Sequence, residues 1–364
     1  MRPRGFAIAF ALALITSATV HAAPVIATTV EGAEHSGALS RLDARTVELQ
    51  DGETTRTLSW DELTALTFDD ALNAAANPRQ AAFYLADGGR LTGTLIAGDA
   101  AGVGVRGEQA VDWEIPWDRL GAIHLPGGDA EARALFEKTR ADPPTGKDVL
   151  IARTAEGPKV LRGMLVALTP QDGEFRFAGR SRRFSTAKVE GVVLGLGSRR
   201  DDQLPFTLEL ANGDAFTARD VVLHEGNLRA SASYADVIDL PRERVRGLRY
   251  RNPRVLPITT LPPQQQQSRG IVHPDWVIRF DRNVFNGPLR ISGKTYDHGL
   301  GMHARAQVTY ALAGGFETFA ATIGIDDVVR PHGKVRFIVR GDGKSIFDSG
   351  PIAVIRKRQL CCAP

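Results

Sequence analysis

Two adjacent carboxylates, Asp326 and Asp327, are the residues of this chain most readily assigned a chemical role. They follow Gly324 and Ile325, in a stretch typical of a loop. Carboxylate oxygens on a loop can coordinate a hard cation such as Ca²⁺, with backbone carbonyls completing the shell. Asp side chains also hydrogen-bond turns, and this second interpretation stays open. The sequence therefore predicts a candidate structural calcium site at this pair and no other cofactor.

A second candidate is a pair of imidazoles, His298 and His303, in a stretch that also holds Gly299 and Gly301. Such a loop could present its histidines to a ligand hydroxyl or to a metal. Two histidines alone do not make a zinc site, which needs three or four protein ligands. Glycine also permits the close approach of two backbone segments, so a purely structural role is the alternative.

Three motifs share one window of the sequence and follow one another in a fixed order. They are Gly-x-x-Tyr-x-x-Gly-x-Gly-x-His at 293–303, Gly-x-Asp-Asp at 324–327 and Phe-x-Val-x-x-Asp-Gly-Lys at 337–344. This combination resembles the NPCBM module, a carbohydrate-binding module found with glycoside hydrolase family 98 enzymes and some α-galactosidases. The resemblance covers residues 270–355. It implies a jelly-roll β-sandwich of the galactose-binding-like superfamily and a carbohydrate ligand.

The resemblance also points to the residues that would bind the carbohydrate. An exposed aromatic ring beside a few polar groups is the arrangement expected for a sugar. The candidates are Trp276, Tyr296, His298, His303, Asp326 and Asp327. Phe316 is a further aromatic side chain that could stack on a sugar ring. Trp276 belongs to an alternating strand pattern, so core packing is the alternative for it.

The tail of the chain, residues 356–364, differs in composition from the module before it. It is basic and contains the only cysteines, Cys361 and Cys362. Adjacent cysteines rarely bridge each other, because the ring would be strained. We expect this tail to form no strand. We also expect the module to be truncated, with strands of its sandwich missing.

Residues 25–250 carry a weak fourfold repeat. Each copy opens with a strand–turn–strand segment and closes with a charged turn followed by a short apolar strand. The opening residues are Gly37, Gly93, Gly163 and Ala218, and the closing residues are Leu63, Leu120, Val189 and Val245. The two positions stand 26 or 27 residues apart in every copy. Because unrelated segments would rarely keep this distance, we expect four small domains, at 25–70, 80–126, 147–196 and 204–251.

The residue pattern of these copies predicts strands. β-Branched and aromatic residues alternate with polar ones, and turn pairs separate the runs. The turn pairs are Asp51-Gly52, Asp87-Gly88, Asp172-Gly173 and Asn212-Gly213. Five short strands in about 50 residues can close only a small barrel. The copies resemble SH3-like or Sm-like barrels, and Trp60 and Trp117, at equivalent positions, are predicted core residues.

Two further segments connect these parts. Residues 129–141 begin acidic and end basic, which complements the helix dipole and predicts a connector helix. Residues 253–269 are predicted to be a linker, because the Pro- and Gln-rich stretch at 261–268 lacks an apolar face. The predicted fold class is therefore mainly β. Tandem small β-barrel-like units are followed by a linker and a partial jelly-roll β-sandwich.

The first 22 residues are typical of a secretory signal. Arg2 and Arg4 precede an apolar run at 6–15 that is too short to span a bilayer. Small residues suit cleavage near Ala22/Ala23, so we expect export to the periplasm or the exterior; a retained anchor is the alternative. No other segment predicts a transmembrane span.

The formal net charge of the chain is +3, and the leader carries two arginines. The remainder is therefore nearly neutral, and nucleic-acid binding is not expected.

Two common catalytic motifs are missing from the sequence. It contains neither a Gly-x-Ser-x-Gly elbow nor a His-Glu-x-x-His zinc helix. A glycosidase needs two carboxyl groups facing the scissile bond, and no pair stands in such a context. We therefore expect an exported, non-catalytic protein that binds glycans at the cell envelope or outside it. The alternatives are a structural or protein-interaction protein whose barrels bind partners, and an accessory subunit of a glycoside hydrolase.

Overall fold

The computed structural model describes residues 24–69, 77–99, 101–107, 112–195, 204–269, 277–329, 333–353 and 358–362. These residues form thirty β-strands, a single α-helix and short 3₁₀ turns, so the predicted mainly-β class is confirmed. The predicted leader, residues 1–22, and Trp276 lie outside the described residues. None of the described helices is long and apolar enough to cross a membrane.

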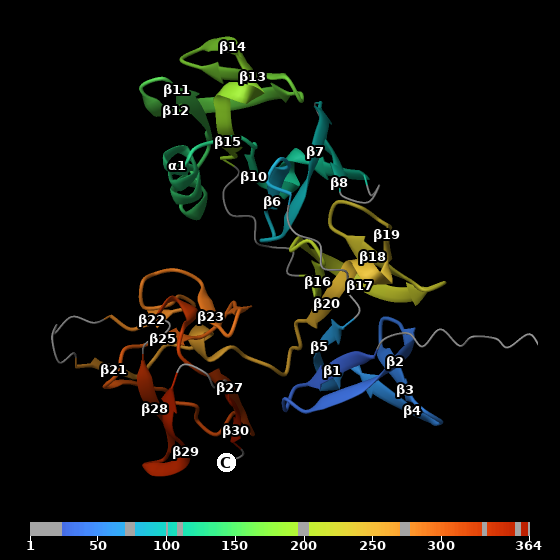
Figure 1. The fold of residues 1–364 in the computed structure, drawn as a ribbon, viewed down its shortest axis with the longest axis vertical. Coiled ribbons are helices and arrows are strands. Elements are labelled where there is room, and N and C mark those ends of the chain that lie inside the picture. Colours follow the sequence, from blue (N-terminus) through green and yellow to red (C-terminus); the bar gives the residue numbers. More distant parts are fainter. Residues whose placement is uncertain are drawn as a thin grey trace, which may run out of the picture.

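The part of the chain before residue 251 contains four five-stranded units, coloured from blue to gold in Figure 1. Unit 1 holds β1 (Val25–Thr29), β2 (Glu34–Leu42), β3 (Thr46–Asp51), β4 (Thr54–Ser59) and β5 (Leu63–Phe68). Unit 2 holds β6 (Ala81–Leu85), β7 (Arg90–Gly98), β8 (Gly102–Gly107), β9 (Asp112–Pro116) and β10 (Leu120–His124). Unit 3 holds β11 (Asp148–Thr154), β12 (Gly157–Leu168), β13 (Asp172–Phe177), β14 (Arg180–Ser185) and β15 (Val189–Val193). Unit 4 holds β16 (Phe206–Leu210), β17 (Ala215–His224), β18 (Asn227–Ala232), β19 (Ile238–Pro241) and β20 (Val245–Tyr250).

Each unit has the same topology. The first four strands form an antiparallel meander, and the first strand also pairs with the fifth. Pairing the first and last strands curls each sheet into a small barrel. The tandem small β-barrel-like units predicted from the repeat are therefore confirmed.

A 3₁₀ turn joins the fourth strand to the fifth in every unit. These turns are η1 (Trp60–Glu62), η2 (Trp117–Arg119), η3 (Thr186–Lys188) and η4 (Arg242–Arg244). The indole N–H of Trp60 donates to the carbonyl of Asp43 at 2.9 Å, and that of Trp117 donates to the carbonyl of Asp99 at 2.7 Å. Trp60 is buried, as predicted, whereas Trp117 is only partly buried.

The opening residues of the repeat occupy one register position. Gly37, Gly93, Gly163 and Ala218 each pair with the beginning of the first strand of their unit. A Cβ atom on Gly93 would lie 2.5 Å from the carbonyl oxygen of Arg106 on the neighbouring strand. Glycine is therefore needed there because two backbones approach closely.

Three of the four predicted turn pairs hold a glycine with positive φ, namely Gly52, Gly88 and Gly213. The prediction of a turn at Asp172-Gly173 was wrong, because both residues belong to β13. The ring of Phe184 occupies the space where a Cβ atom of Gly173 would lie. This glycine makes room for an aromatic ring and does not turn the chain.

The units join through their fifth strands. β5 pairs with β20, which links units 1 and 4, and β10 pairs with β15, which links units 2 and 3. Units 2 and 4 meet where Arg90 of β7 pairs with Ala215 of β17. Figure 1 accordingly shows the units in the spatial order 1, 4, 2, 3.

The single described α-helix, α1 (Ala130–Ala141), does more than connect units 2 and 3. Asp129 caps its N-terminus by accepting the N–H of Ala132 at 2.8 Å. Phe136 is fully buried in a small core with Val149 and Ile151 of β11. The helix therefore covers one face of unit 3 and is part of that unit's core.

The C-terminal part consists of strand pairs, shown in orange and red in Figure 1. Its strands are β21 (Gln265–Ser268), β22 (Arg279–Phe280), β23 (Leu289–Ile291), β24 (Lys294–Tyr296), β25 (Leu300–Gly301), β26 (Ala306–Thr309), β27 (Phe319–Ile323), β28 (Lys334–Gly341), β29 (Lys344–Ala353) and β30 (Arg358–Cys362). Short 3₁₀ turns lie at η5 (Ile258–Thr260) and η6 (Asp327–Val329). The pairs are β21–β26, β22–β25, β23–β24, β27–β30 and β28–β29, all antiparallel.

Two sequence predictions fail in this part. The predicted linker contains β21, which pairs with β26 although its glutamines are exposed. The tail, expected to form no strand, contains β30, which pairs with β27. In both cases pairing depends on backbone N–H and C=O groups, which any residue other than proline supplies in full.

Candidate functional site

The motif carboxylates Asp326 and Asp327 fasten the β23–β24 hairpin. Asp326 Oδ2 accepts the N–H of Arg290 at 3.0 Å. Asp327 accepts the N–H of Ser292 at 2.9 Å through Oδ1 and the N–H of Gly293 at 2.7 Å through Oδ2. The structure therefore places both carboxylates at the hairpin turn, in the role that the second sequence interpretation describes.

Asp326 also joins this hairpin to the turn at residues 281–287. Its Oδ1 accepts the side-chain amide of Asn283 at 3.3 Å and the N–H of Val328 at 3.0 Å. Asn283 is 5% exposed, so the amide side of this contact is buried. The Asn283–Asp326 bond brings together two loops that are 43 residues apart in the sequence.

His298 lies at the far side of the same turn. Its Nδ1 stands 3.4 Å from Asp281 Oδ1, and that oxygen also accepts the N–H of Gly299 at 3.0 Å. Both side chains keep substantial contact with solvent, at 51% for His298 and 39% for Asp281. The pair can therefore donate and accept hydrogen bonds at the surface, and it gains an ionic component when the imidazole is protonated.

The remaining candidates are less accessible. Tyr296 is half-buried on β24, and its hydroxyl oxygen is enclosed without a hydrogen-bond partner among the described residues. Burial lowers the pKa of His303 below its usual value, because desolvation disfavours the imidazolium. His303 is therefore mostly neutral at pH 7 and suited to exchanging hydrogen bonds with neutral groups.

The glycines of the histidine motif have a structural role. A Cβ atom on Gly301 would collide with the backbone of Arg282 and Asn283. Gly299 adopts φ of 158° and faces the side chain of Leu289. The motif therefore brings β25 against the 281–287 turn and places His298 beside Asp281.

Residues 256–359 match the family model of the NPCBM/NEW2 domain. The C-terminal part of this chain is an NPCBM/NEW2 domain. This is a family of carbohydrate-binding modules. The match begins at Leu256, earlier than the predicted start at residue 270, and so it includes β21, which is paired with β26.

A curated protein shares part of this chain. A stretch of 62 residues is 42% identical to a protein of Renibacterium salmoninarum (strain ATCC 33209) named "Putative endo-alpha-N-acetylgalactosaminidase". The matched stretch is 17% of this chain and 4% of that protein. The likeness therefore concerns one segment and carries over nothing of the larger protein's activity.

Sequence reasoning missed the most exposed aromatic side chain of the NPCBM/NEW2 domain among the described residues, Phe285, at 68%. It stands on the turn that Asn283 organises, since the Phe285 N–H donates to Asn283 Oδ1 at 3.0 Å. The signal that could have found it is Asn286-Gly287, a turn pair that follows Phe285 directly. Phe316, the other exposed phenylalanine of this domain, is 41% exposed.

The calcium prediction meets an unfavourable environment in the domain. The oxygens of Asp326 and Asp327 already accept hydrogen bonds from one side-chain amide and four backbone N–H groups. N–H donors carry positive partial charge and would repel a cation. The described part of the chain also contains no group of three or more His, Cys, Asp or Glu residues that could hold a metal. These residues do not make a ready calcium cage.

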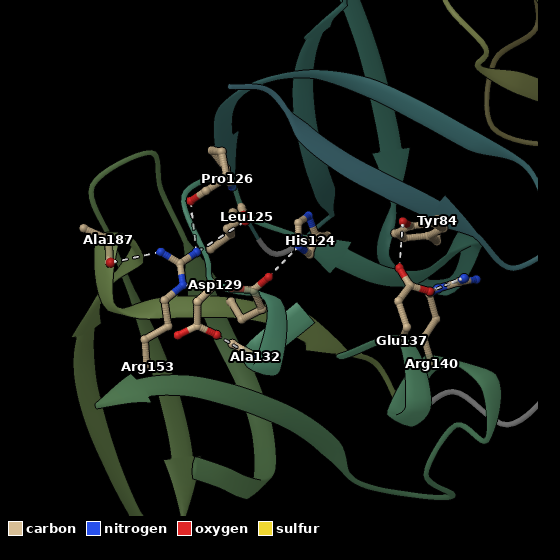
Figure 2. Close-up of polar contacts among 11 residues, drawn as sticks. Tyr84, His124, Leu125, Pro126, Asp129, Ala132, Glu137, Arg140, Arg153 and Ala187 are labelled. Carbon is tan, nitrogen blue, oxygen red and sulfur yellow. Dashed lines mark hydrogen bonds and ion pairs between the residues drawn. The ribbon is translucent and has the colours of Figure 1, made fainter. Parts of the chain in front are cut away.

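A second polar cluster lies away from the NPCBM/NEW2 domain, between units 2 and 3 (Figure 2). Glu190 is fully buried and is held by His124 Nε2 at 2.7 Å and by Arg153 Nε at 2.9 Å. Arg153 Nη2 also donates to the carbonyls of Leu125 and Pro126. These are residue types used in catalysis, but here every one of them holds two barrels together.

Proposed function

We propose that this chain is an exported, non-catalytic protein that binds glycans through its NPCBM/NEW2 domain. One observation carries the proposal, the match of residues 256–359 to a family of carbohydrate-binding modules. Two features support it: the Asn283–Asp326 hydrogen bond fixes the turn at residues 281–287, and the His298–Asp281 pair supplies exposed polar groups beside that turn. Such preorganised groups can bind sugar hydroxyls without first being ordered.

The contacts of the motif carboxylates support the non-catalytic part of the proposal. Glycoside hydrolysis needs two carboxyl groups free to act on the scissile bond. Asp326 and Asp327 instead accept backbone N–H groups, and Asp281 accepts the N–H of Gly299. These three side chains therefore position loops.

A second candidate function is an accessory role beside a glycoside hydrolase. The observation that favours it is the segment shared with a protein whose name describes a glycosidase. In this role the NPCBM/NEW2 domain would hold an enzyme near its polysaccharide, and the barrels would contact the enzyme. The effective concentration of the enzyme at its polysaccharide would rise, although this chain would supply no catalytic group.

The test of glycan binding uses the mature chain, residues 23–364, in affinity electrophoresis through gels that contain neutral polysaccharides. Galactans, glucans, mannans and a mucin rich in N-acetylgalactosamine cover the common pyranoses. We expect retardation by at least one of them, with no release of reducing sugar on long incubation. Migration unaffected by every polysaccharide would contradict glycan binding, and released sugar would contradict the non-catalytic part.

Export is tested separately, because it depends on the leader. The full chain and a chain that lacks residues 2–22 are expressed in a Gram-negative host and the cells are fractionated. We expect the full chain outside the cytoplasm with a new N-terminus at or next to Ala23, and the shortened chain inside. An uncleaved full chain in the cytoplasm would sink the export proposal.

A further inference from the structure

The turn at residues 281–287 is built around one buried side chain, Asn283. Its Oδ1 accepts the N–H of Phe285 at 3.0 Å and that of Gly287 at 2.8 Å. Its Nδ2 donates to the carbonyl of Pro288 at 3.1 Å and to Asp326 Oδ1 at 3.3 Å. The amide thus uses both donors and accepts twice, so the turn has one strongly preferred conformation.

Backbone geometry adds to this rigidity. Asp281 and Asn286 adopt φ of 57° and 67°, values that cost a non-glycine residue free energy. Such conformations persist where surrounding contacts fix them. Here the backbone bonds from Asn283 N to the Gly287 carbonyl and from Asn286 N to the Asn283 carbonyl, both 2.9 Å, do so.

This rigid turn presents an aromatic ring to solvent. Phe285 is 68% exposed although it follows a buried residue by only two positions. Val328, 54% exposed, stands on the adjoining loop. Three hydrogen bonds link the backbones of these two residues. The N–H of Phe285 donates to Asn283 Oδ1, and the N–H of Val328 donates to Asp326 Oδ1. The side-chain amide of Asn283 in turn donates to Asp326 Oδ1.

We propose that Phe285, extended by Val328, is the platform on which the NPCBM/NEW2 domain stacks a neutral pyranose ring. The inference rests on the proposed function and names the site and the ligand class within it. A pyranose has one face of C–H groups that packs on an aromatic face, and its hydroxyls at the ring edge need polar partners. A preorganised platform binds without the entropy cost of ordering a loop.

Polar partners stand at the rim of the platform. Asn286 follows Phe285 directly, and its Oδ1 accepts Arg279 Nη1 at 3.4 Å. The Asn286 amide nitrogen donates to none of the described residues, so it is available to a sugar hydroxyl. Arg279 Nε donates to the carbonyl of Val284 at 3.3 Å, which fixes the guanidinium beside the turn.

The charge balance of this region selects a neutral ligand. Residues 277–329 contain five Lys or Arg and five Asp or Glu. A uronate or sulfated sugar would meet the carboxylates of Asp281 and Asp326 without a net positive field to hold it. Binding of a neutral sugar is therefore expected to change little with salt.

The experiment measures binding of the mature chain to immobilised galactose, N-acetylgalactosamine, glucose and mannose, with galacturonic acid as the charged comparison. Phe285→Ala is set against Phe316→Ala, the other exposed phenylalanine of the domain, and both are checked for unchanged melting temperature. We expect Phe285→Ala to weaken binding of the neutral sugar roughly tenfold or more, as truncating a central aromatic anchor does, and Phe316→Ala to leave it within about twofold.

The outcomes separate this inference from the proposed function. Wild-type binding that survives in Phe285→Ala, or a preference for galacturonic acid that collapses with salt, overturns the platform and leaves glycan binding intact. Absence of wild-type binding to any sugar overturns the proposed function and the platform with it. Loss of binding in Phe316→Ala alone would move the site to another loop and also overturn the inference.

Discussion

Among single residues, Asn283 and Asp326 determine the shape of the candidate site. They hydrogen-bond each other, and each also fixes backbone N–H groups of a neighbouring loop. A satisfied buried polar group contributes modestly to stability, whereas removing one partner leaves several groups unpaired. These two residues should therefore matter for folding of the domain as well as for its binding surface.

Replacing Asn283 with Ala is expected to lower the free energy of unfolding of the NPCBM/NEW2 domain by about 2 kcal/mol, because the N–H groups of Phe285 and Gly287 lose their acceptor. Chemical denaturation of the mature chain measures this. The control is Arg282→Ala on the same turn, an exposed position without a positive φ, expected to change stability by about 0.5 kcal/mol or less. Equal stability of the two variants would contradict the central role of Asn283.

Replacing Asp326 with Ala separates the turn role from the calcium role. Since the carboxylates serve N–H donors, the wild-type melting temperature should be the same with millimolar calcium and with a chelator. The variant should melt several degrees lower in both conditions. A wild-type melting temperature that rises with calcium, and no longer does so in the variant, would instead support the calcium prediction made from the sequence.

The sequence identified the residues of the motif but not the exposed side chains around it. Asp326 and Asp327 could be identified because adjacent carboxylates after a glycine are a visible pattern, and the turn alternative described their contacts. Phe285 could not be identified from the sequence, because a phenylalanine is usually buried. Its exposure depends on how the Asn283 turn packs against β25. Exposure is a tertiary property, and single-residue patterns do not encode it.

At the scale of elements, the barrels depend on close contacts between neighbouring strands. Gly93 on β7 faces the Arg106 carbonyl and the Val105 side chain of β8, at 2.5 and 2.6 Å from a hypothetical Cβ. Gly104, on β8 itself, has its nearest such neighbour at 3.6 Å, an ordinary contact. These two glycines form a natural comparison between crowded and open positions in one hairpin.

Gly93→Ala is expected to destabilise unit 2 by about 1–3 kcal/mol, since the added methyl group forces the β7–β8 backbones apart. Gly104→Ala, the matched control, should lie within about 1 kcal/mol of wild type. Thermal unfolding followed by far-ultraviolet circular dichroism distinguishes them. If both variants melt together, close strand approach is not the reason for glycine at the opening of the repeat.

Element prediction succeeded where side chains carry the signal. Alternating residues indicated strands in the repeat, the turn pairs of units 1, 2 and 4 were correct, and the acidic and basic ends located α1. It failed at β21 and β30, where exposed glutamines and a basic tail form strands through backbone pairing. It also misread Gly173, whose role is to admit the ring of Phe184.

The whole molecule is a chain of barrels with the NPCBM/NEW2 domain attached at one end. Arg249 of unit 4 bridges Glu209 at 2.7 Å and Asp297 of the domain. Asn252, 3% exposed, donates to the carbonyls of Trp60, Asp61 and Leu63 in unit 1. The order of units was not predictable, because strand edges that pair across barrels have no distinctive side-chain pattern.

The junction of units 2 and 4 contains a buried carboxyl group whose charge depends on pH. Asp214 is 3% exposed and accepts the N–H of Thr92 at 2.7 Å. Burial raises its pKa above the usual 3.8, against the opposing hydrogen bonds of Thr92 and Asn212 and the charge of Arg90. Its contribution to stability is therefore complete below pH 3.8 and is lost as the pH rises through the folded-state pKa.

Asp214→Asn is accordingly expected to be stabilised relative to wild type at pH 7, where the wild-type chain buries a charge, and to lose that advantage as the pH falls through the folded-state pKa towards 3.8. Denaturation at several pH values measures the difference. The control is Asp112→Asn, an exposed carboxyl on β9, expected to stay within about 0.5 kcal/mol of wild type. An advantage that grows as the pH falls would contradict the buried-charge account.

The central claim, glycan binding by the NPCBM/NEW2 domain, is tested most directly on a glycan array probed with the mature chain and its Phe285→Ala variant side by side. The account predicts wild-type signal on one group of neutral glycans that share a terminal pyranose, and loss of that signal in the variant at equal thermal stability. Wild-type signal no higher than that of a non-binding control on every glycan would contradict it.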